Sequence, residues 1–276
     1  MSAAQLSNLQ LRFLSAVVLA IVVLGLTWLG GLPFRLFAAL IGAAIFYEWC
    51  AMSRTVANAS YQMLTALFLA AVLLALLAGL PAATVLLVLA GAVVASIAVG
   101  LVRGQGSWPT IGLAYAGFSA VSLAFLRGGD HSGLVAILFL FATVWATDIL
   151  AYFAGRTIGG PKLAPAISPG KTWSGAIGGA VGGLAAGLIA AALAGVANLS
   201  VLGLVALLLS VVSQMGDLFE SWVKRRCGVK DSGAIIPGHG GVMDRVDGLV
   251  AAAFALYVIG WMAGGADHPA RGLFPL

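Results

Sequence analysis

Charged residues concentrate in one short stretch of an otherwise apolar chain. Ten of the 23 Asp, Glu, Lys and Arg residues lie between positions 214 and 247. The acids are Asp217, Glu220, Asp231, Asp244 and Asp247, and the bases are Lys224, Arg225, Arg226, Lys230 and Arg245. Ionisable groups at membrane depth are costly, so a cluster of them usually marks a functional site. Because carboxylates bind cations while Lys and Arg bind phosphates, the mixture predicts a polar site for a metal ion and phosphate groups.

The spacing of these acids predicts two helix faces that meet. Ser213, Asp217 and Ser221 follow at intervals of four, so they line one face of a helix. Asp244 and Asp247 are three residues apart and share a face where the next helix is expected to begin. Acids from two helix ends that meet across the loop would supply oxygen ligands for Mg²⁺. The alternative is a set of ion pairs with neighbouring bases, which explains single residues but not their concentration.

A glycine-rich segment, PGHGG at 237–241, separates the two faces. Glycines on both sides of His239 permit positive φ angles and close backbone approach, which favours a nest of N–H groups around an anion. We expect His239, Gly240 and Gly241 to contact a substrate phosphate or a site carboxylate. A purely structural histidine is the alternative.

A second polar segment lies upstream. Asp148 stands inside an apolar stretch, where it either bonds to a neighbouring helix or belongs to a polar site. Further on, Ser168 is expected to open a helix that starts near Lys171 and Thr172. A helix N-terminus with these side chains offers N–H groups, hydroxyls and a cation to a phosphate. The alternative is a capped helix with a lysine that flanks the membrane.

The sequence GKT at 170–172 imitates the end of a P-loop. That pattern requires a glycine five residues before Gly170, where this chain has Pro165, and no strand is expected ahead of it. A nucleotide-binding fold of the P-loop class is therefore excluded.

The composition indicates a membrane protein. Hydrophobic residues make up 62% of the chain and charged residues 8%, with a mean hydropathy of +1.09, which excludes an ordinary soluble globule. A spanning helix needs about 20 mostly apolar residues. Nine such segments are predicted, at 11–30, 33–52, 61–79, 82–102, 108–126, 133–154, 173–197, 199–222 and 246–264. Strand-like alternation is absent, so we expect an all-α integral membrane protein, a bundle of about nine transmembrane helices.

The basic residues predict the orientation of this bundle. The N-terminus and the loops after every second helix contain eleven Lys and Arg residues, whereas the other face contains Arg35, Arg127 and Arg271. The positive-inside rule then places the charged loops in the cytoplasm of a bacterial-type inner membrane. Without the loops of the polar site the count is three against three, so the site and the orientation are not independent. We interpret 1–147 as transmembrane scaffold and 148–276 as the catalytic part of one continuous membrane domain.

The predicted helix at 173–197 carries a ridge of glycines. Gly175, Gly179, Gly183 and Gly187 recur at intervals of four, which lets another backbone approach closely in a bilayer. The ridge is expected to pack within the bundle or between subunits.

The motifs together resemble a known family. The segment Ser221–Asp247 reads S-x-V-K-R-x4-K-D-x-G-x2-I-P-x-H-G-G-V-x-D-R-V-D, which is similar at every specified position to the signature of the phosphatidate cytidylyltransferases. Upstream, D-x2-A-Y-x2-G-R from Asp148 and I-S-P-x-K-T from Ile167 resemble the second block of that family. The resemblance covers 100 residues, 148–247, and the first 147 residues agree with the family only in being hydrophobic.

The resemblance implies an enzyme that joins CTP and phosphatidic acid into CDP-diacylglycerol and pyrophosphate in phospholipid biosynthesis. It implies Mg²⁺ held by Asp217 and Asp244, with room for a second cation. The bases Lys171, Lys224, Arg225, Lys230 and Arg245 would hold phosphates, while Asp231 and Asp247 would orient bases or complete the outer shell of the metal. We expect a homodimer in contact with membrane lipid, and no nucleic-acid partner.

Two other classes of protein remain as alternatives. A secondary transporter would also show buried acids and glycine-broken helices, but its charged site should lie near the bilayer midplane, often in two related halves. A lipid-binding scaffold protein would explain the basic loops but not the paired acids. The charges gather at one face of the second half, which favours the enzyme.

Overall fold

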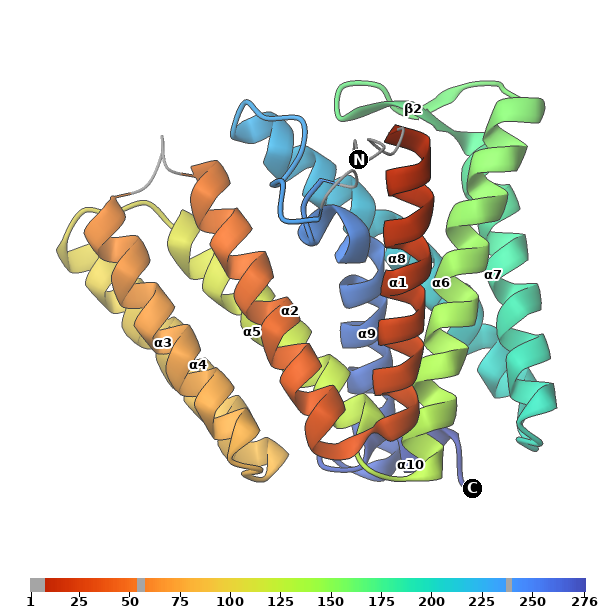
Figure 1. The fold of residues 1–276 in the computed structure, drawn as a ribbon, viewed down its shortest axis with the longest axis horizontal. Helices are drawn as coiled ribbons and strands as arrows, with labels where there is room; N and C mark the ends of the chain where they lie inside the picture. Colours follow the sequence, from red (N-terminus) through yellow and green to blue (C-terminus); the bar gives the residue numbers. More distant parts are fainter. Residues whose placement is uncertain (1–7, 54–57, 237–239) are drawn as a thin grey trace, which may run out of the picture.

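Helices form most of the computed structural model, which describes residues 8–53, 58–236 and 240–276. Its elements run, in chain order, α1 (Asn8–Leu29), α2 (Gly31–Met52), α3 (Ala59–Leu77), α4 (Ala82–Val102), α5 (Trp108–Arg127), α6 (His131–Thr157), β1 (Lys162–Ala164), β2 (Ser168–Thr172), α7 (Trp173–Leu193), α8 (Leu199–Arg226), α9 (Met243–Gly264) and α10 (Pro269–Leu273). The long helices stand side by side, and the two strands lie at one end of the bundle (Figure 1).

The prediction of an all-α integral membrane protein is confirmed. Within the described ranges, eight helices, α2 to α9, are long and apolar enough to cross a membrane. Each of the nine predicted segments overlaps one helix. The first segment overlaps α1, in which the stretch Ala16–Leu29 is apolar. The largest differences are at the ends of two helices: α8 continues to Arg226, and α7 already ends at Leu193. The strands and α10 were not predicted.

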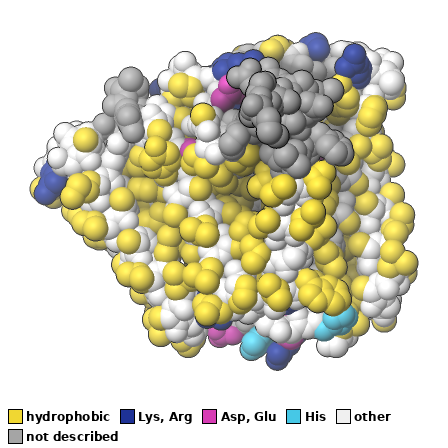
Figure 2. Space-filling model, viewed as in Figure 1, with side chains coloured by type: hydrophobic (Ala, Val, Ile, Leu, Met, Phe, Trp, Pro, Cys, Tyr) yellow, Lys and Arg dark blue, Asp and Glu magenta, His cyan; other side chains and the backbone are white. Residues whose placement is uncertain are grey.

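The surface has the charge distribution of a membrane-spanning bundle. Hydrophobic side chains cover the middle of the face shown in Figure 2, whereas Lys, Arg, Asp, Glu and His side chains appear at its two ends. Large apolar side chains such as Leu87 and Leu204 are exposed on their helices. Exposed apolar surface of this extent is expected where helices face lipid.

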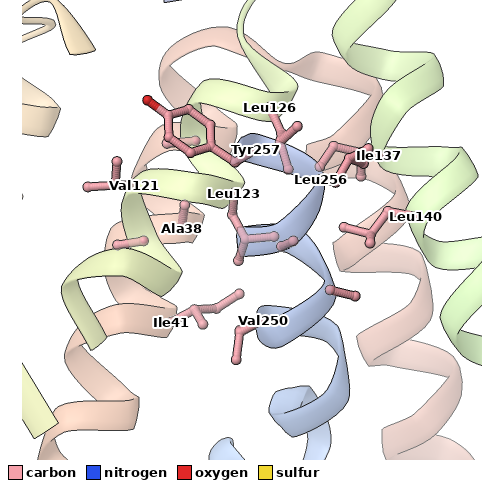
Figure 3. Close-up of a cluster of buried hydrophobic side chains, with 14 of the residues drawn as sticks. Ala38, Ile41, Val121, Leu123, Leu126, Ile137, Leu140, Val250, Leu256 and Tyr257 are labelled. Atoms are coloured by element: carbon pink, nitrogen blue, oxygen red, sulfur yellow. The ribbon is translucent and has the colours of Figure 1, made fainter. Parts of the chain in front are cut away.

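The core lies where α2, α5, α6 and α9 meet (Figure 3). Side chains of all four helices interdigitate there, among them Ala38, Ile41, Val121, Leu123, Ile137, Leu140, Val250 and Leu256. This packing joins α9, which carries two of the predicted site acids, to helices of the first half of the chain.

A short β-hairpin precedes α7. Lys162 pairs with Thr172, and Ala164 pairs with Ser168, in antiparallel register. Thr172 ends the second strand and caps α7, because its hydroxyl accepts a hydrogen bond of 3.1 Å from the N–H of Gly175. The helix therefore starts where the sequence predicted, but Ser168 belongs to a strand rather than to the helix start. Ser168 lies in a strand because the two strands pair with each other, and the local signals for a helix start carry no information about that pairing.

The glycine ridge of α7 packs inside the bundle. A Cβ atom added at Gly175 or Gly179 would lie 2.8 Å from a carbonyl oxygen of α6, that of Ala151 or Thr147. At Gly183 the added atom would overlap the Thr147 hydroxyl and lie 2.9 Å from Ser210 Cβ on α8. The ridge thus allows α6, α7 and α8 to approach closely, which is the packing within the bundle that was predicted as one of two alternatives.

At the end of the bundle opposite the hairpin, basic residues stabilise the fold. Arg127 is buried and donates hydrogen bonds to the carbonyl oxygens of Thr27, at 2.5 Å, and Asp130, at 2.9 Å. Arg271 binds the Asp130 carboxylate at 2.6 Å. Burial disfavours the charge of Asp130, but hydrogen bonds from Gly133 N–H and Arg271 outweigh it and hold its pKa below the ordinary value. Two of the three bases on this face therefore have structural partners.

The close packing at the glycine ridge can be tested by substitution. Gly183→Ala should lower the melting temperature of the detergent-solubilised protein, because overpacking costs about 1–3 kcal/mol. Gly91→Ala on α4 is the matched control, since a Cβ there would meet no described atom within 4 Å. That control should be neutral or slightly stabilising, because alanine favours helix more than glycine does. Equal melting temperatures for the two variants would contradict the assigned packing.

Candidate active site

A cavity opens at the hairpin end of the bundle, between α6, the hairpin, α7 and α8. It has a volume of about 650 Å³. The polar side chains that line it belong to Asp148, Tyr152, Arg156, Lys162, Lys171, Thr172, Gln214 and Asp217. Four predicted site residues, Asp148, Lys171, Thr172 and Asp217, therefore line one space, although they come from separate parts of the sequence. With three cationic side chains, the cavity has the chemistry of a site for phosphate groups.

One ion pair joins the two polar segments that the sequence analysis singled out. Lys171 Nζ lies 2.5 Å from Asp217 Oδ2, and both residues line the cavity. Ser221 Oγ donates to the other oxygen, Oδ1, at 3.4 Å. The predicted stripe on α8 therefore forms in part, and the acid at its centre faces the lysine at the end of the hairpin.

Asp244 is the centre of a second cluster. Its Oδ1 lies 2.7 Å from Lys224 Nζ. Its Oδ2 accepts hydrogen bonds from Ser232 N–H and Ser232 Oγ, both at 2.9 Å, and from Gly241 N–H at 3.0 Å. Asp244 therefore ties the start of α9 to the end of α8 and to both sides of the glycine-rich loop.

Glu48, on α2, reaches the same loop from the first half of the chain. Its side chain is fully buried, and its carboxylate accepts hydrogen bonds of 2.8 Å from the N–H groups of Val242 and Met243. Ser232 Oγ lies 3.1 Å from Glu48 Oε2. The sequence analysis missed this residue, although an acid inside an apolar helix was the signal that identified Asp148.

Three consecutive backbone N–H groups, from the last residue of the glycine-rich segment onward, donate to carboxylates of the chain. Gly241 N–H donates to Asp244, and the next two N–H groups donate to Glu48. Carboxylates of the chain thus occupy the donors that follow the segment, and the nest predicted around His239 stays a prediction. Gly240 has a φ of +85° and pairs with Ile236 across the loop. His239 lies outside the described residues.

The remaining predicted site residues lie around these two clusters. Ser213 is buried and donates to the carbonyl oxygen of Ser210 at 2.9 Å. Arg225 Nε approaches the carbonyl oxygen of Ile167 at 3.5 Å, which links α8 to the hairpin. Lys230, Asp231 and Arg245 have exposed side chains. The structure thus brings most of these residues to one end of the bundle.

A buried acid lies between the two clusters. Glu220 has no exposed surface, and within the described residues neither of its carboxyl oxygens has a hydrogen-bond partner. Lys224 Nζ is 3.4 Å from its Oε1, an ion pair without hydrogen-bond geometry. Asp247, whose Oδ1 accepts from its own neighbour Gly248 at 2.7 Å, is near enough to act on Glu220 electrostatically. The oxygens of a buried carboxylate without donors, such as Glu220, are of the chemical type that a divalent cation prefers as ligands.

The types of residue at this end of the bundle suit a metal ion, but the described residues do not form a complete set of ligands for one. In the described part of the chain, no three His, Cys, Asp or Glu side chains converge as ligands of one ion. Asp217 and Asp244 each face a lysine in the structure. Carboxylate oxygens at this end of the bundle fit a hard cation, with the remaining ligands supplied by substrate phosphates or water.

Comparisons with known proteins show the family of this chain. Residues 10–263 match the model of the cytidylyltransferase family. A phosphatidate cytidylyltransferase of Brucella suis biovar 1 is 51% identical over 275 residues, which covers 98% of this chain and 99% of the relative. One of Brucella abortus (strain 2308) is 52% identical over 261 residues, covering 92% and 94%. One of Haemophilus influenzae is 41% identical over 142 residues, about half of each chain.

The class defined by fold and site is an integral membrane nucleotidyltransferase, and the chain belongs to the cytidylyltransferase family. The family match includes α2 and with it Glu48, a part of the chain in which the sequence analysis had found only hydrophobic similarity.

Proposed function

We propose that this protein is a phosphatidate cytidylyltransferase, which converts CTP and phosphatidic acid into CDP-diacylglycerol and pyrophosphate. The observation that carries the proposal is the 51% identity to a protein of that name over 98% of the chain. The cavity supports it, because cationic side chains at the end of a membrane bundle suit one soluble and one lipid-bound anion.

The reaction determines what the site has to do. A phosphate oxygen of phosphatidic acid attacks the α-phosphorus of CTP, and the bond from that phosphorus to the β-phosphate oxygen breaks. Two anions must approach each other, and negative charge grows on the departing pyrophosphate. Catalysis is therefore mostly positioning and electrostatic stabilisation. The attacking oxygen is already anionic, so the reaction needs no Ser–His or Cys–His pair to activate it.

The ion pairs of the site are suited to exchange partners with substrate. Lys171 and Lys224 each hold a carboxylate, at 2.5 and 2.7 Å. A phosphate bound to these lysines would free Asp217 and Asp244, which are the residues that would hold Mg²⁺. Such an exchange would avoid leaving buried charges unpaired in either state. Arg156 and Lys162, which line the cavity, join the predicted phosphate-binding residues.

The metal, when bound, would neutralise charge on the phosphates. We retain Asp217 and Asp244 as its proposed ligands, and Glu220 with Asp247 leaves room for a second cation. Asp148, Ser168, Thr172, Ser213 and Ser221 remain proposed contacts to substrate, directly or through neighbouring groups.

Location and assembly belong to the same proposal. The apolar helices and the bacterial relatives are consistent with a bacterial cytoplasmic membrane, with the cavity on the cytoplasmic side. A homodimer remains a prediction. The glycine ridge gives it no support, because α6 and α8 within the same chain occupy that ridge.

The function is tested with the purified protein in mixed micelles. CTP and phosphatidic acid together should yield CDP-diacylglycerol and pyrophosphate in equal amounts, and omission of the lipid should abolish pyrophosphate release. A transporter would instead move a solute across proteoliposomes without consuming CTP. Absence of both products from folded protein would contradict the proposal.

The metal ligands are tested by Asp217→Asn and Asp244→Asn. Each should lower kcat roughly 100-fold or more, since the loss of one strong electrostatic contact to the transition state has that magnitude. EDTA should silence the wild type and Mg²⁺ restore it. Asp130→Asn, at the opposite end of the bundle, is the matched control and should retain activity. An active Asn variant at Asp217 or Asp244 would remove that residue from the metal site.

The division of labour between the two loops is tested by Lys171→Ala and Lys230→Ala. A hydrogen bond to a charged group is worth about 1.5–3 kcal/mol, or roughly a factor of 10 to 100 in kcat/KM. We expect both variants to lose activity, with unequal effects on the KM values for CTP and phosphatidic acid. Arginine should restore activity only in part, because its planar fork does not replace a compact ammonium group. Exposed Arg103→Ala is the control. Unchanged constants in Lys171→Ala would make the hairpin purely structural.

The orientation is tested with single reporter cysteines in a background that lacks Cys50 and Cys227. Ala234→Cys lies in the loop after α8, and Gly129→Cys lies at the opposite end of the bundle; both positions are exposed. In intact spheroplasts, an impermeant thiol reagent should label Gly129→Cys at once and Ala234→Cys only after permeabilisation. The reverse pattern would overturn the proposed topology.

A further inference from the structure

The contacts of Glu48 are those of a residue that positions its neighbours, not of a residue that faces lipid or packs in the apolar core. It lies one residue before Trp49, near the end of α2 that faces the glycine-rich loop, and its side chain has no exposed surface. An ionised group in such a place is costly unless hydrogen-bond donors surround it. Here three donors do so: Val242 N–H, Met243 N–H and Ser232 Oγ, at 2.8, 2.8 and 3.1 Å.

The backbone donors are the N–H groups that open α9. The first N–H groups of a helix have no partner within the helix, and the helix dipole favours a negative charge beside them. Val242, at the N-cap position, makes no side-chain capping bond. Glu48 takes this role from another helix, so α2 caps α9 across the bundle.

The chain leaves room for this carboxylate at two glycines. A Cβ added at Gly233 would lie 2.7 Å from Glu48 Oε1. A Cβ added at Gly241 would lie 2.7 Å from Oε2 and would overlap the hydroxyl of Ser232. Both sides of the loop therefore close around Glu48, and both glycines are needed for that approach.

Ser232 connects Glu48 to the proposed metal ligand. Its hydroxyl oxygen lies between two carboxylates, 3.1 Å from Glu48 Oε2 and 2.9 Å from Asp244 Oδ2, and has one proton to donate. Asp244 in turn faces Lys224 with its other oxygen. A displacement of Glu48 would therefore move the start of α9 and the serine that together orient Asp244.

The end of α2 itself is rigidly held. Trp49 Nε1 donates to the carbonyl oxygen of Trp108 at 2.8 Å, and its ring stacks on Phe219 of α8 with a centroid distance of 6.4 Å. The carboxylate of Glu48 thus projects from a helix that is already anchored to α5 and α8. An anchored carboxylate can impose a position on the loop, which a mobile one could not.

We propose that Glu48 is a positioning residue for cytidylyl transfer: it fixes the first turn of α9 and Ser232, and thereby holds Asp244 in register with Lys224. This inference rests on the proposed function, because it assumes that Asp244 serves the reaction. It also explains why the helix N-terminus of α9 is not open to a substrate phosphate: the chain supplies its own anion there.

The test compares Glu48→Gln with Tyr61→Phe. Glutamine keeps the shape but cannot accept at both oxygens, so kcat should fall on the order of 10–100-fold, as for other residues that support a polar site. The KM for CTP should change less than kcat. Tyr61→Phe removes an equally buried hydroxyl that bonds Ser96 and Thr110 within the bundle. It should lower the melting temperature and leave kcat unchanged.

A double-mutant cycle with Ser232→Ala separates positioning from a general loss of stability. Glu48→Gln and Ser232→Ala should be strongly non-additive in kcat/KM, because both act through Asp244, whereas Tyr61→Phe and Ser232→Ala should be additive. If Glu48→Gln does not fold, Ser232→Ala decides: a folded protein with wild-type kcat overturns the proposal. So does a folded Glu48→Gln protein with wild-type kcat. An inactive wild type would instead refute the proposed function.

Discussion

The compensation of buried negative charge is the constraint on which this end of the bundle depends. A carboxylate buried in an apolar bundle is costly without donors, and Glu48 and Asp244, each with partners on both oxygens, share Ser232 between them. Through these two acids, the start of α9 is tied to α2, to α8 and to the loop after α8.

Close helix packing decides where the cavity lies. The glycines of α7 bring it against α6 and α8, so the side chains at the ends of these helices converge beside the hairpin. Asp148, Lys171 and Asp217 come from three different elements, and they share a space only because these elements approach so closely. Fold and site are therefore coupled through residues that carry no functional group.

The pairing of acids with lysines has a consequence for the chemistry. In the structure, Lys171 and Lys224 bind Asp217 and Asp244, which are the acids proposed to bind metal. Without substrate, each of these acids thus forms a neutral pair with a lysine. A substrate phosphate can replace the acid beside each lysine, and a cation can replace the lysine beside each acid. Glu220 is the exception, with a lysine at 3.4 Å but no hydrogen bond in the described residues, and a cation would improve its surroundings most.

The sequence by itself determined the membrane class, the helical segments and the polar ends of α8 and α9, because hydropathy and helical periodicity are local properties. Its motifs also indicated the family that the comparisons confirm. Only the tertiary structure decided that Glu48 reaches the start of α9, that Lys171 meets Asp217, and that carboxylates of the chain occupy the N–H groups beside the glycine-rich segment. These are contacts between elements separated by up to 195 positions, and no local pattern encodes which buried donor a carboxylate will find. The hairpin before α7 is a smaller case of the same kind, since the pairing of Ser168 with Ala164 overrides a local signal for a helix start.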